Sequence, residues 1–285
     1  MTIKGGYDLH VHSGPDVVER VVNDIELAER YKKIGMDGFV IKAHQFLSVY
    51  RANLVNSLVD QFKVIGSITL NNAVGGINPF AVEKAAMLGA KIVWFPTVDS
   101  LHQKQFLEET GAPRPYGAGK PNGRSGEYLT VLENGKISKK TDSVLEVIKE
   151  NNIALATGHL SPLESIKLVR RAKEVGINKI IITHASFKMT YFSDELLKEA
   201  VRCGAYIEQC YYTACTKNNT FEDIIRQIKY VGCKNTIIST DLGQSGNDYP
   251  DIGIQKFVEV LSNYGKFSEK SIEEMLINNP KYLID

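Results

Sequence analysis

Short apolar runs alternate with longer segments of helical periodicity along the whole chain, and this alternation repeats about eight times. Several of the short runs are almost continuously apolar, which is typical of strands buried on both faces. Regular alternation of strands and helices indicates a parallel sheet with crossover helices. The predicted strands span residues 7–12, 38–44, 63–70, 91–97, 153–159, 179–184, 205–210 and 236–241.

Capping residues mark several helix boundaries between these strands. Ser161 and Glu164 form a capping box around a proline, so a helix begins directly after His159. Ser193 opens another helix, which Gly204 ends after a single apolar stripe. No phosphate-binding glycine turn follows any predicted strand, which argues against an open doubly wound sheet. The sequence therefore predicts an α/β protein with a (β/α)8 TIM barrel.

One connection interrupts this rhythm. About 44 residues separate the fourth strand from the next helix, near Asp142, far more than an ordinary loop needs. Within it, Asn134 and Gly135 predict the turn of a β-hairpin, and the remainder is rich in glycine, proline and basic residues. We expect residues 99–141 to form a lid over the barrel mouth, inserted after strand 4 of a single domain that spans residues 1–285.

The composition favours a folded protein that acts on a small molecule. Of the residues, 43% are apolar, enough for a sizeable core. The chain has 34 basic and 33 acidic residues, and a formal charge of +1 gives no general attraction for nucleic acid or membranes. We therefore expect a small-molecule substrate and neither of those two partners.

The four cysteines show no CxxC spacing and indicate reduced thiols. The segment before the first apolar run, residues 1–7, is short and polar, and no apolar run approaches the ~18 residues of a membrane span. We expect a cytoplasmic protein. The helices of such barrels often carry exposed aromatic and aliphatic residues, so a homodimer or higher homo-oligomer is expected.

Five of the six histidines stand at or near the carboxyl ends of predicted strands. In a barrel of parallel strands these ends all lie on one face, where residues distant in sequence converge. A carboxylate, Asp241, ends the eighth strand. The histidines concerned are His10, His12, His44, His159 and His184.

The spacing of His10 and His12 places both imidazoles on one side of the first strand, toward the barrel interior. Imidazoles together with a carboxylate suit zinc or a related first-row divalent ion. Core positions would be apolar if no ligand were bound. We predict one or two Zn2+ ions, with Mn2+, Fe2+ or Ni2+ as alternatives. Asp241 supplies the carboxylate, although aspartate at such a position can also cap a helix.

These motifs together resemble the amidohydrolase superfamily of metal-dependent barrels, and the resemblance covers nearly the whole chain. It implies metal ligation by His10, His12, His159 and His184, with Asp241 as both ligand and proton acceptor. The motifs that carry it are Asp8-Leu9-His10-Val11-His12, Gly158-His159, Thr183-His184, Ser239-Thr240-Asp241 and the closing Asn279-Pro280-Lys281-Tyr282-Leu283.

Two departures from that family pattern stand out. The fourth strand lacks the lysine carbamate or glutamate that bridges two metals, and Asp99 just beyond it is interpreted as a loop residue. One metal is therefore favoured over two. On the second strand, His44 is an added ligand, a catalytic group or a substrate contact, and Lys42 is either buried against a carboxylate or in contact with substrate.

The chemistry that follows is hydrolysis of an amide, lactone, ester or similar bond by metal-activated water. Asp241 takes the proton of the water and passes it to the leaving group, and His184 and His44 complete the predicted catalytic set. Arginines of the lid fit an anionic substrate group, because their fork matches carboxylate or phosphate. The predicted substrate contacts are Lys42, His44, Arg114, Arg124, Glu208 and Tyr211.

Three alternatives stay open at this point. One is decarboxylation, or an aldol-like reaction, at a mononuclear zinc on the same scaffold. Another is a phosphoesterase of the polymerase-and-histidinol-phosphatase type, but that family needs a terminal Asp-x-His, and Asp241 is followed by Leu242 and Gly243. The last is a barrel that binds a metal or ligand without turnover.

Overall fold

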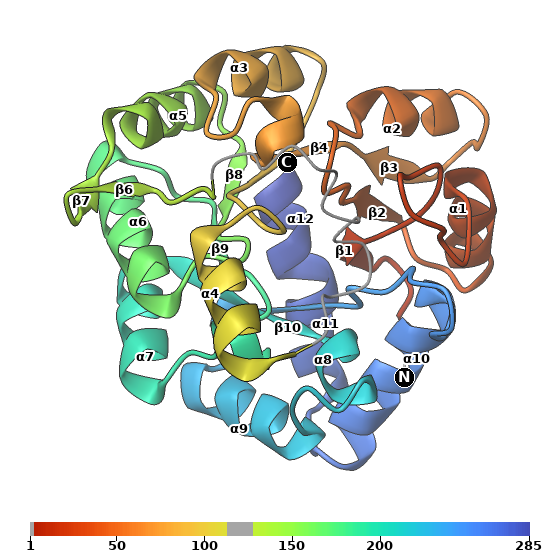
Figure 1. Ribbon diagram of the computed structural model, residues 1–285. Helices are drawn as coiled ribbons and strands as arrows, with labels where there is room; N and C mark the ends of the chain where they lie inside the picture. The colour runs from red at the N-terminus through yellow and green to blue at the C-terminus, as the bar shows by residue number, and fades with distance from the viewer. Residues whose placement is uncertain (1–2, 113–127) are drawn as a thin grey trace.

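The computed structural model describes residues 3–112 and 128–285. Parallel strands form a ring with the helices outside it (Figure 1), so the predicted (β/α)8 barrel is confirmed. The third barrel strand consists of two halves, β3 and β4. The strands of the ring are β1 (Tyr7–Val11), β2 (Gly38–Ile41), β3 (Lys63–Ile65), β4 (Ser67–Thr69), β5 (Ile92–Trp94), β8 (Ala154–Ala156), β9 (Ile180–Ile182), β10 (Ala205–Cys210) and β11 (Thr236–Ser239).

Most of these strands end earlier than the sequence predicts. The predicted segments run on to polar residues such as His159, His184 and Asp241, which lie just past the hydrogen-bonded ladder. His184 and Asp241 have positive φ angles, 30° and 54°, a conformation that a β-strand does not accommodate. These side chains therefore sit on loops at the carboxyl ends of the strands, the face where barrel sites are built.

The ladder is interrupted between β3 and β4 at Gly66. A Cβ at this glycine would lie 2.4 Å from the Cα of Val49, so only glycine allows helix α2 (Val49–Asn56) to approach the strand. The hydroxyl of Ser48 fills the gap: it accepts from Ser67 N at 2.9 Å and donates to Ile41 O at 2.7 Å. The side chain of Ser48 thus replaces part of the missing ladder.

The ring of strands is interrupted a second time where the first strand, β1, meets the last, β11. An isolated parallel bridge joins Val11 to Leu242. His12 N donates to Leu242 O, and Asp241 N donates to His10 O, both at 2.8 Å. These bonds bring the ends of β1 and β11 edge to edge.

Two apolar clusters fill the space between the strands and the surrounding helices. The expected caps are present: Ser161 and Glu164 form a capping box, and the side chain of Ser193 accepts from Leu196 N. The outer helices are α1 (Asp24–Lys33), α2, α3 (Pro79–Met87), α5 (Lys139–Glu150), α6 (Pro162–Val175), α7 (Asp194–Arg202), α9 (Phe221–Val231) and α10 (Pro250–Asn263).

A separate apolar cluster fills the interior of the barrel and includes Leu9 and Trp94. Its floor is closed by α12 (Asn279–Ile284), which Figure 1 shows in the middle of the ring. Leu283 and Ile284 are fully buried in this cluster. The side-chain amide of Asn279 donates to the carbonyl of Thr236 at 2.7 Å, which fixes the helix beneath β11.

The long connection after β5 is partly ordered. The predicted hairpin is present as β6 (Leu132–Glu133) and β7 (Lys136–Ile137), and both turn residues, Asn134 and Gly135, have the positive φ that this turn needs. The sequence analysis missed helix α4 (Leu101–Thr110), which Ser100 caps. Residues 113–127 of the predicted lid lie outside the described residues.

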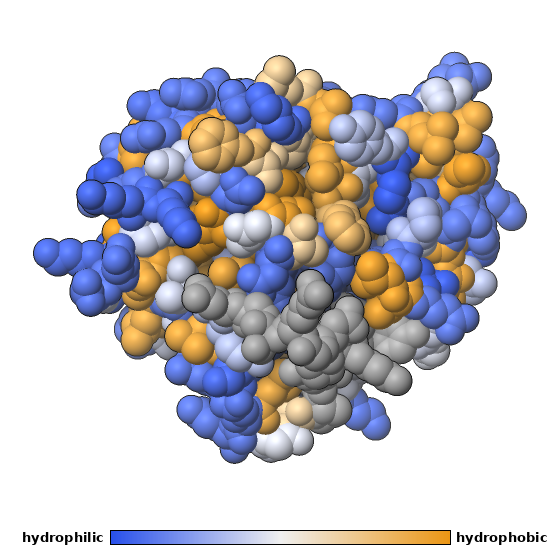
Figure 2. Space-filling model, turned by 45° about the horizontal axis from the view of Figure 1, so that its top comes forward, coloured by the Kyte–Doolittle hydropathy of each residue, from blue (hydrophilic) through white to orange (hydrophobic). Residues whose placement is uncertain are grey.

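The surface mixes hydrophilic and apolar residues on the face seen in Figure 2. Among the helices of the described residues, none combines the length and the apolar character required to cross a bilayer. All four cysteines are free thiols.

Gly243 is the residue on which the closure of the barrel depends most sharply. Its φ is 129°, and a Cβ there would lie 1.5 Å from the carbonyl oxygen of His12. Gly204 is the matched control, because its φ is also positive, at 88°, but its Cβ would meet nothing within 4 Å. We expect Gly204→Ala to lower the free energy of unfolding by ~1–2 kcal/mol, the backbone strain alone.

We expect Gly243→Ala to lower the free energy of unfolding by more than ~4 kcal/mol, because the backbone of β1 must move as well. Urea denaturation followed by circular dichroism measures both values. Equal losses for the two variants would contradict this role of Gly243.

Candidate metal centre

Five buried imidazoles form a closed ring at the carboxyl ends of the strands. Neighbouring ring centroids are 5.4 Å apart for His10 and His12, 4.8 Å for His12 and His44, and 5.9 Å for His44 and His159. The ring centroids of His159 and His184 are 5.0 Å apart. Those of His184 and His10 are 6.0 Å apart, which closes the ring. The structure thus brings together the five histidines that the sequence analysis singled out.

Asp241 meets two of these imidazoles at one point. Its Oδ1 lies 3.0 Å from Nε2 of His10 and 3.0 Å from Nε2 of His12. These three possible ligand atoms lie within 4.8 Å of one another. Asp241 does not cap a helix, since α10 begins only at Pro250. Its side chain is 12% exposed, so solvent reaches this part of the site.

A register shift in β1 between Asp8 and Val11 sets the direction of the first two histidines. Leu9 belongs to the interior cluster, and the ring of His10 also lies inside, 4.8 Å from that of Trp94. Two consecutive side chains therefore face the interior, as at a β-bulge.

The carboxylate of Asp8 braces this bulge. It accepts hydrogen bonds from His10 N at 3.1 Å, from Thr240 Oγ1 at 2.6 Å and from the hydroxyl of Tyr31 at 2.6 Å. Complete burial raises the pKa of Asp8 to about 6, against the effect of these hydrogen bonds. Asp8 thus ties β1 to the end of β11 and to α1.

Each of four imidazoles is held at Nδ1 by a neighbouring side chain. His10 faces Glu208, at 3.1 Å to Oε2. The partners of His44, His159 and His184 are Thr97 Oγ1 at 2.9 Å, Gln103 Oε1 at 2.5 Å and Thr190 Oγ1 at 2.9 Å. Such contacts orient metal-binding histidines and fix their tautomer. Among the described residues, Nε2 of His44, His159 and His184 has no hydrogen-bond partner and is available to a ligand.

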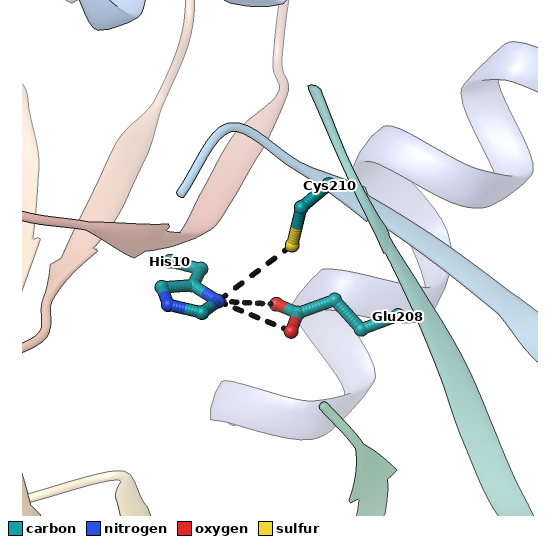
Figure 3. A group of neighbouring side chains, drawn as sticks. All are labelled: His10, Glu208 and Cys210. Carbon is teal, nitrogen blue, oxygen red and sulfur yellow. Dashed lines mark hydrogen bonds and ion pairs between the residues drawn. The ribbon is translucent and has the colours of Figure 1, made fainter. Parts of the chain in front are cut away.

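Glu208 and Cys210 both point toward the same nitrogen of His10 (Figure 3). Glu208 is fully buried, both oxygens face Nδ1 of His10, and Oε2 also accepts from His184 N at 3.0 Å. Cys210 Sγ lies 3.8 Å from the same nitrogen of His10. The expected substrate contact by Glu208 therefore does not match its position, which suits it to orient His10.

Lys42 is buried inside the site, but its nearest partners are an imidazole and an indole ring rather than the carboxylate that the sequence analysis considered. Its Nζ lies 2.9 Å from Nε2 of His10 and 4.4 Å from the ring centroid of Trp94. Burial lowers the pKa of Lys42, and the charges of Asp241 and Glu208 act in the opposite direction. Because Lys42 faces the nitrogen that a metal would use, a bound cation requires this contact to open.

Tyr211 opens helix α8 (Tyr211–Cys215), and its ring packs with its centroid 5.9 Å from those of Phe221 and Phe257. Its hydroxyl donates to Asp248 at 3.4 Å, and its contact with substrate stays a prediction. The next residue, Tyr212, stacks on Phe187, whose ring in turn contacts His184.

Arg114 and Arg124, two further candidates from the sequence, lie outside the described residues. Asp99 accepts from Asn72 N at 2.8 Å and is a loop residue, as interpreted. The end of β5 offers Thr97 rather than a carboxylate or lysine.

Burial keeps most of these imidazoles neutral. It lowers the pKa of His12 to about 3 and that of His184 to about 4, and it holds those of His44 and His159 well below the usual value. Burial raises the pKa of Asp241, but the charge of His10 and hydrogen bonds from His10 and His12 outweigh it and keep the pKa well below its usual value. Burial also lowers the pKa of His10, but the charges of Asp241 and Glu208 outweigh it and raise that pKa. At neutral pH the site thus holds four neutral imidazoles and a carboxylate, the forms that bind metals.

Solved structures with the same architecture include several hydrolases. An amidohydrolase from Pseudomonas aeruginosa aligns at 13% identity with a TM-score of 0.66, over 100% of this chain and 98% of the other. An organophosphorus hydrolase from Deinococcus radiodurans aligns at 12% identity with a TM-score of 0.62, over 99% and 92%.

A third structure is a phosphotriesterase homology protein from Escherichia coli, complexed with phosphate in its active site. It aligns at 13% identity with a TM-score of 0.59, over 100% of both chains. At these identities the likeness shows a shared barrel fold.

Sequence comparison leads to one family. No curated protein matches the chain. Residues 5–208 match a family described as a family of unknown function (DUF6282), and this segment contains four of the barrel's histidine-bearing strand ends. The chain belongs to this family of unknown function.

Proposed function

We propose that this protein is a metal-dependent hydrolase that uses activated water on an amide, lactone, ester or similar bond of a small, anionic molecule. One observation carries the proposal: Nε2 of His10 and Nε2 of His12 meet the same oxygen of Asp241 at 3.0 Å, inside a ring of imidazoles. The hydrolases that share the fold support it.

The donor set fits a divalent cation. His10, His12 and Asp241 are the nearest candidates as ligands, and His159 and His184 complete the set that the family resemblance implies. Neutral imidazoles with one carboxylate favour Zn2+, with Mn2+, Fe2+ or Ni2+ as alternatives. One ion is favoured because Thr97 stands where a bridging ligand would be needed. The metal, when bound, supplies Lewis acidity and activates water at neutral pH.

The chain's own residues supply the proton transfers. Asp241 is a carboxylate at neutral pH, so its oxygen accepts the proton of the water and returns it to the leaving group. His44 and His184 are held at Nδ1, which leaves Nε2 to contact an oxygen of the substrate. Glu208, behind His10, keeps that imidazole in one orientation.

Decarboxylation at a single metal is a second candidate. Two features favour it: the site has no bridging ligand at the end of β5, and the ammonium of Lys42 lies inside it, where it can hold a substrate carboxylate. The products separate the two reactions, because a hydrolase incorporates solvent oxygen and a decarboxylase releases carbon dioxide without consuming water.

We also propose a cytoplasmic setting and a homo-oligomer. Free thiols at all four cysteines support a reducing compartment. Exposed apolar side chains on neighbouring outer helices favour burial against a second copy. They include Tyr50 and Leu54 on α2 and Phe80 and Met87 on α3.

The first prediction concerns the metal. Elemental analysis of the purified protein is expected to give about one divalent ion per chain, because the two groups of candidate ligands, His10 with Glu208 and Cys210 and His10 with His12 and Asp241, share His10. A chelator should abolish turnover in a screen of amides, lactones, esters and phosphoesters, and added Zn2+ should restore it. A protein that carries no metal and gains none in solution contradicts the proposal.

The second prediction concerns Asp241. Asp241→Asn is expected to retain metal and fold but to lower kcat by about 10²–10⁴, since the amide cannot accept the proton. Asp248→Asn is the control, because Asp248 follows on the same loop and instead accepts from Lys256 at 2.8 Å. Unchanged turnover of Asp241→Asn with full metal content removes the residue from this role.

The third prediction concerns Glu208. Glu208→Gln is expected to weaken metal affinity by about 10–100-fold, because it removes the charge that orients His10. Competition with a chromogenic chelator measures this affinity, and KM measured at saturating metal should stay near the wild-type value. A raised KM with unchanged metal affinity identifies Glu208 as a substrate contact instead.

A further inference from the structure

The loop that follows β1 carries a buried arginine beside the metal centre. Arg20 forms an isolated antiparallel bridge with Gln244, and Val21 N donates to Gly243 O at 2.9 Å. The side chain of Gln244 in turn donates to the carbonyl of Asp241 at 2.8 Å. The backbone of Arg20 is therefore fixed to the segment that directly follows Asp241.

Only one edge of the Arg20 guanidinium is occupied. Nε and Nη2 donate to the same oxygen of Asp16, at 2.9 and 2.7 Å. Nη1 is buried and has no hydrogen-bond partner among the described residues, and the whole side chain is only 2% exposed, so water does not readily replace that partner. Leaving such a donor unpaired costs about 1–3 kcal/mol or more for a charged group, so an orphan of this kind calls for an acceptor.

The charge of Arg20 reaches the histidines. After burial, the positive charge of Arg20 contributes to the lowered pKa of His12, and it is also the last of the causes that lower the pKa of His44. The guanidinium therefore lies within electrostatic range of both imidazoles. Nδ1 of His12 is a second buried nitrogen without a partner on the same loop.

We propose that the free edge of Arg20 binds an anionic oxygen group of the substrate, a carboxylate or a phosphate, beside the metal centre. This inference rests on the proposed function, and it names the class of substrate on which the enzyme acts. A guanidinium presents two donor edges, and its fork fits carboxylate and phosphate. Asp16 uses the Nε edge and holds the side chain in place, which makes it a positioning residue. The edge with Nη1 is left for the ligand.

The position of this subsite selects the substrate. An anion at Arg20 lies on the β1 and β11 side of the mouth, next to Asp241. The bond that reacts must then lie only a few bonds away from the anionic group, over the ring of imidazoles. Small molecules with a carboxylate or phosphate near the hydrolysed bond are the class that fits.

The experiment measures anion binding directly, without turnover. Chelator-treated protein is titrated by calorimetry with inorganic phosphate and, separately, with succinate, for wild type, Arg20→Met and Arg226→Met. Arg226 is a matched control, since it also pairs with aspartates, Asp194 at 2.6 Å and Asp223 at 3.1 Å, but on the distant surface of α9. Working without metal keeps the result independent of whether the proposed reaction takes place.

Wild type and Arg226→Met are expected to bind at least one of the two anions, and the tighter one identifies the group as phosphate or carboxylate. Arg20→Met should weaken that binding by about 10-fold or more, the loss of a charge-assisted hydrogen bond. If Arg20→Met does not fold, Arg20→Lys serves, because one ammonium that pairs with Asp16 cannot offer a second edge.

Any one of three results overturns the proposal. The first is that neither anion binds the wild type, which leaves water as the partner of Nη1. The second is that the folded Arg20 variant binds as tightly as wild type. The third is that Arg226→Met loses as much affinity as the Arg20 variant, which marks the binding as general charge attraction.

Discussion

The backbone contact between the first and last strands is the constraint on which the site depends. His12 N and Asp241 N each donate across this seam, and the same contact brings Oδ1 of Asp241 to Nε2 of His12, 229 positions earlier in the chain. Gly243 makes the approach possible, because any side chain there would overlap the carbonyl of His12. Barrel closure and assembly of the metal centre are thus one event.

Burial gives this centre its chemical character. Burial removes from His12, His44, His159 and His184 the proton that would exclude a metal, while the contacts of Asp241 with His10 and His12 keep Asp241 a carboxylate. The same low-dielectric surroundings make each remaining charge matter more. The buried Glu208 and Lys42 therefore shift the pKa of His10 in opposite directions, whereas Arg20, on the loop after β1, lowers that of His12.

Much of this arrangement could be predicted from sequence, because strand periodicity places His10, His12, His159, His184 and Asp241 at one end of a barrel. The side chains that hold the histidines at Nδ1 could not be predicted in this way. Gln103 lies on a helix within a long connection, and Thr97 resembles any polar strand end, so only folding shows that they meet His159 and His44. The packing of Tyr211 against Phe221 and Phe257 depends on α8, which begins at that residue, and the pairing of Arg20 with Asp16 depends on the shape of a loop.

Helix α12 has a consequence for how the protein is made. Leu283 and Ile284 complete the apolar floor beneath Leu9 and Trp94, so this interior stays open to water until α12 has docked. The earlier strands can pair during synthesis, but their inward faces have no cover until then. Detachment of α12 alone therefore exposes apolar surface in the middle of the barrel.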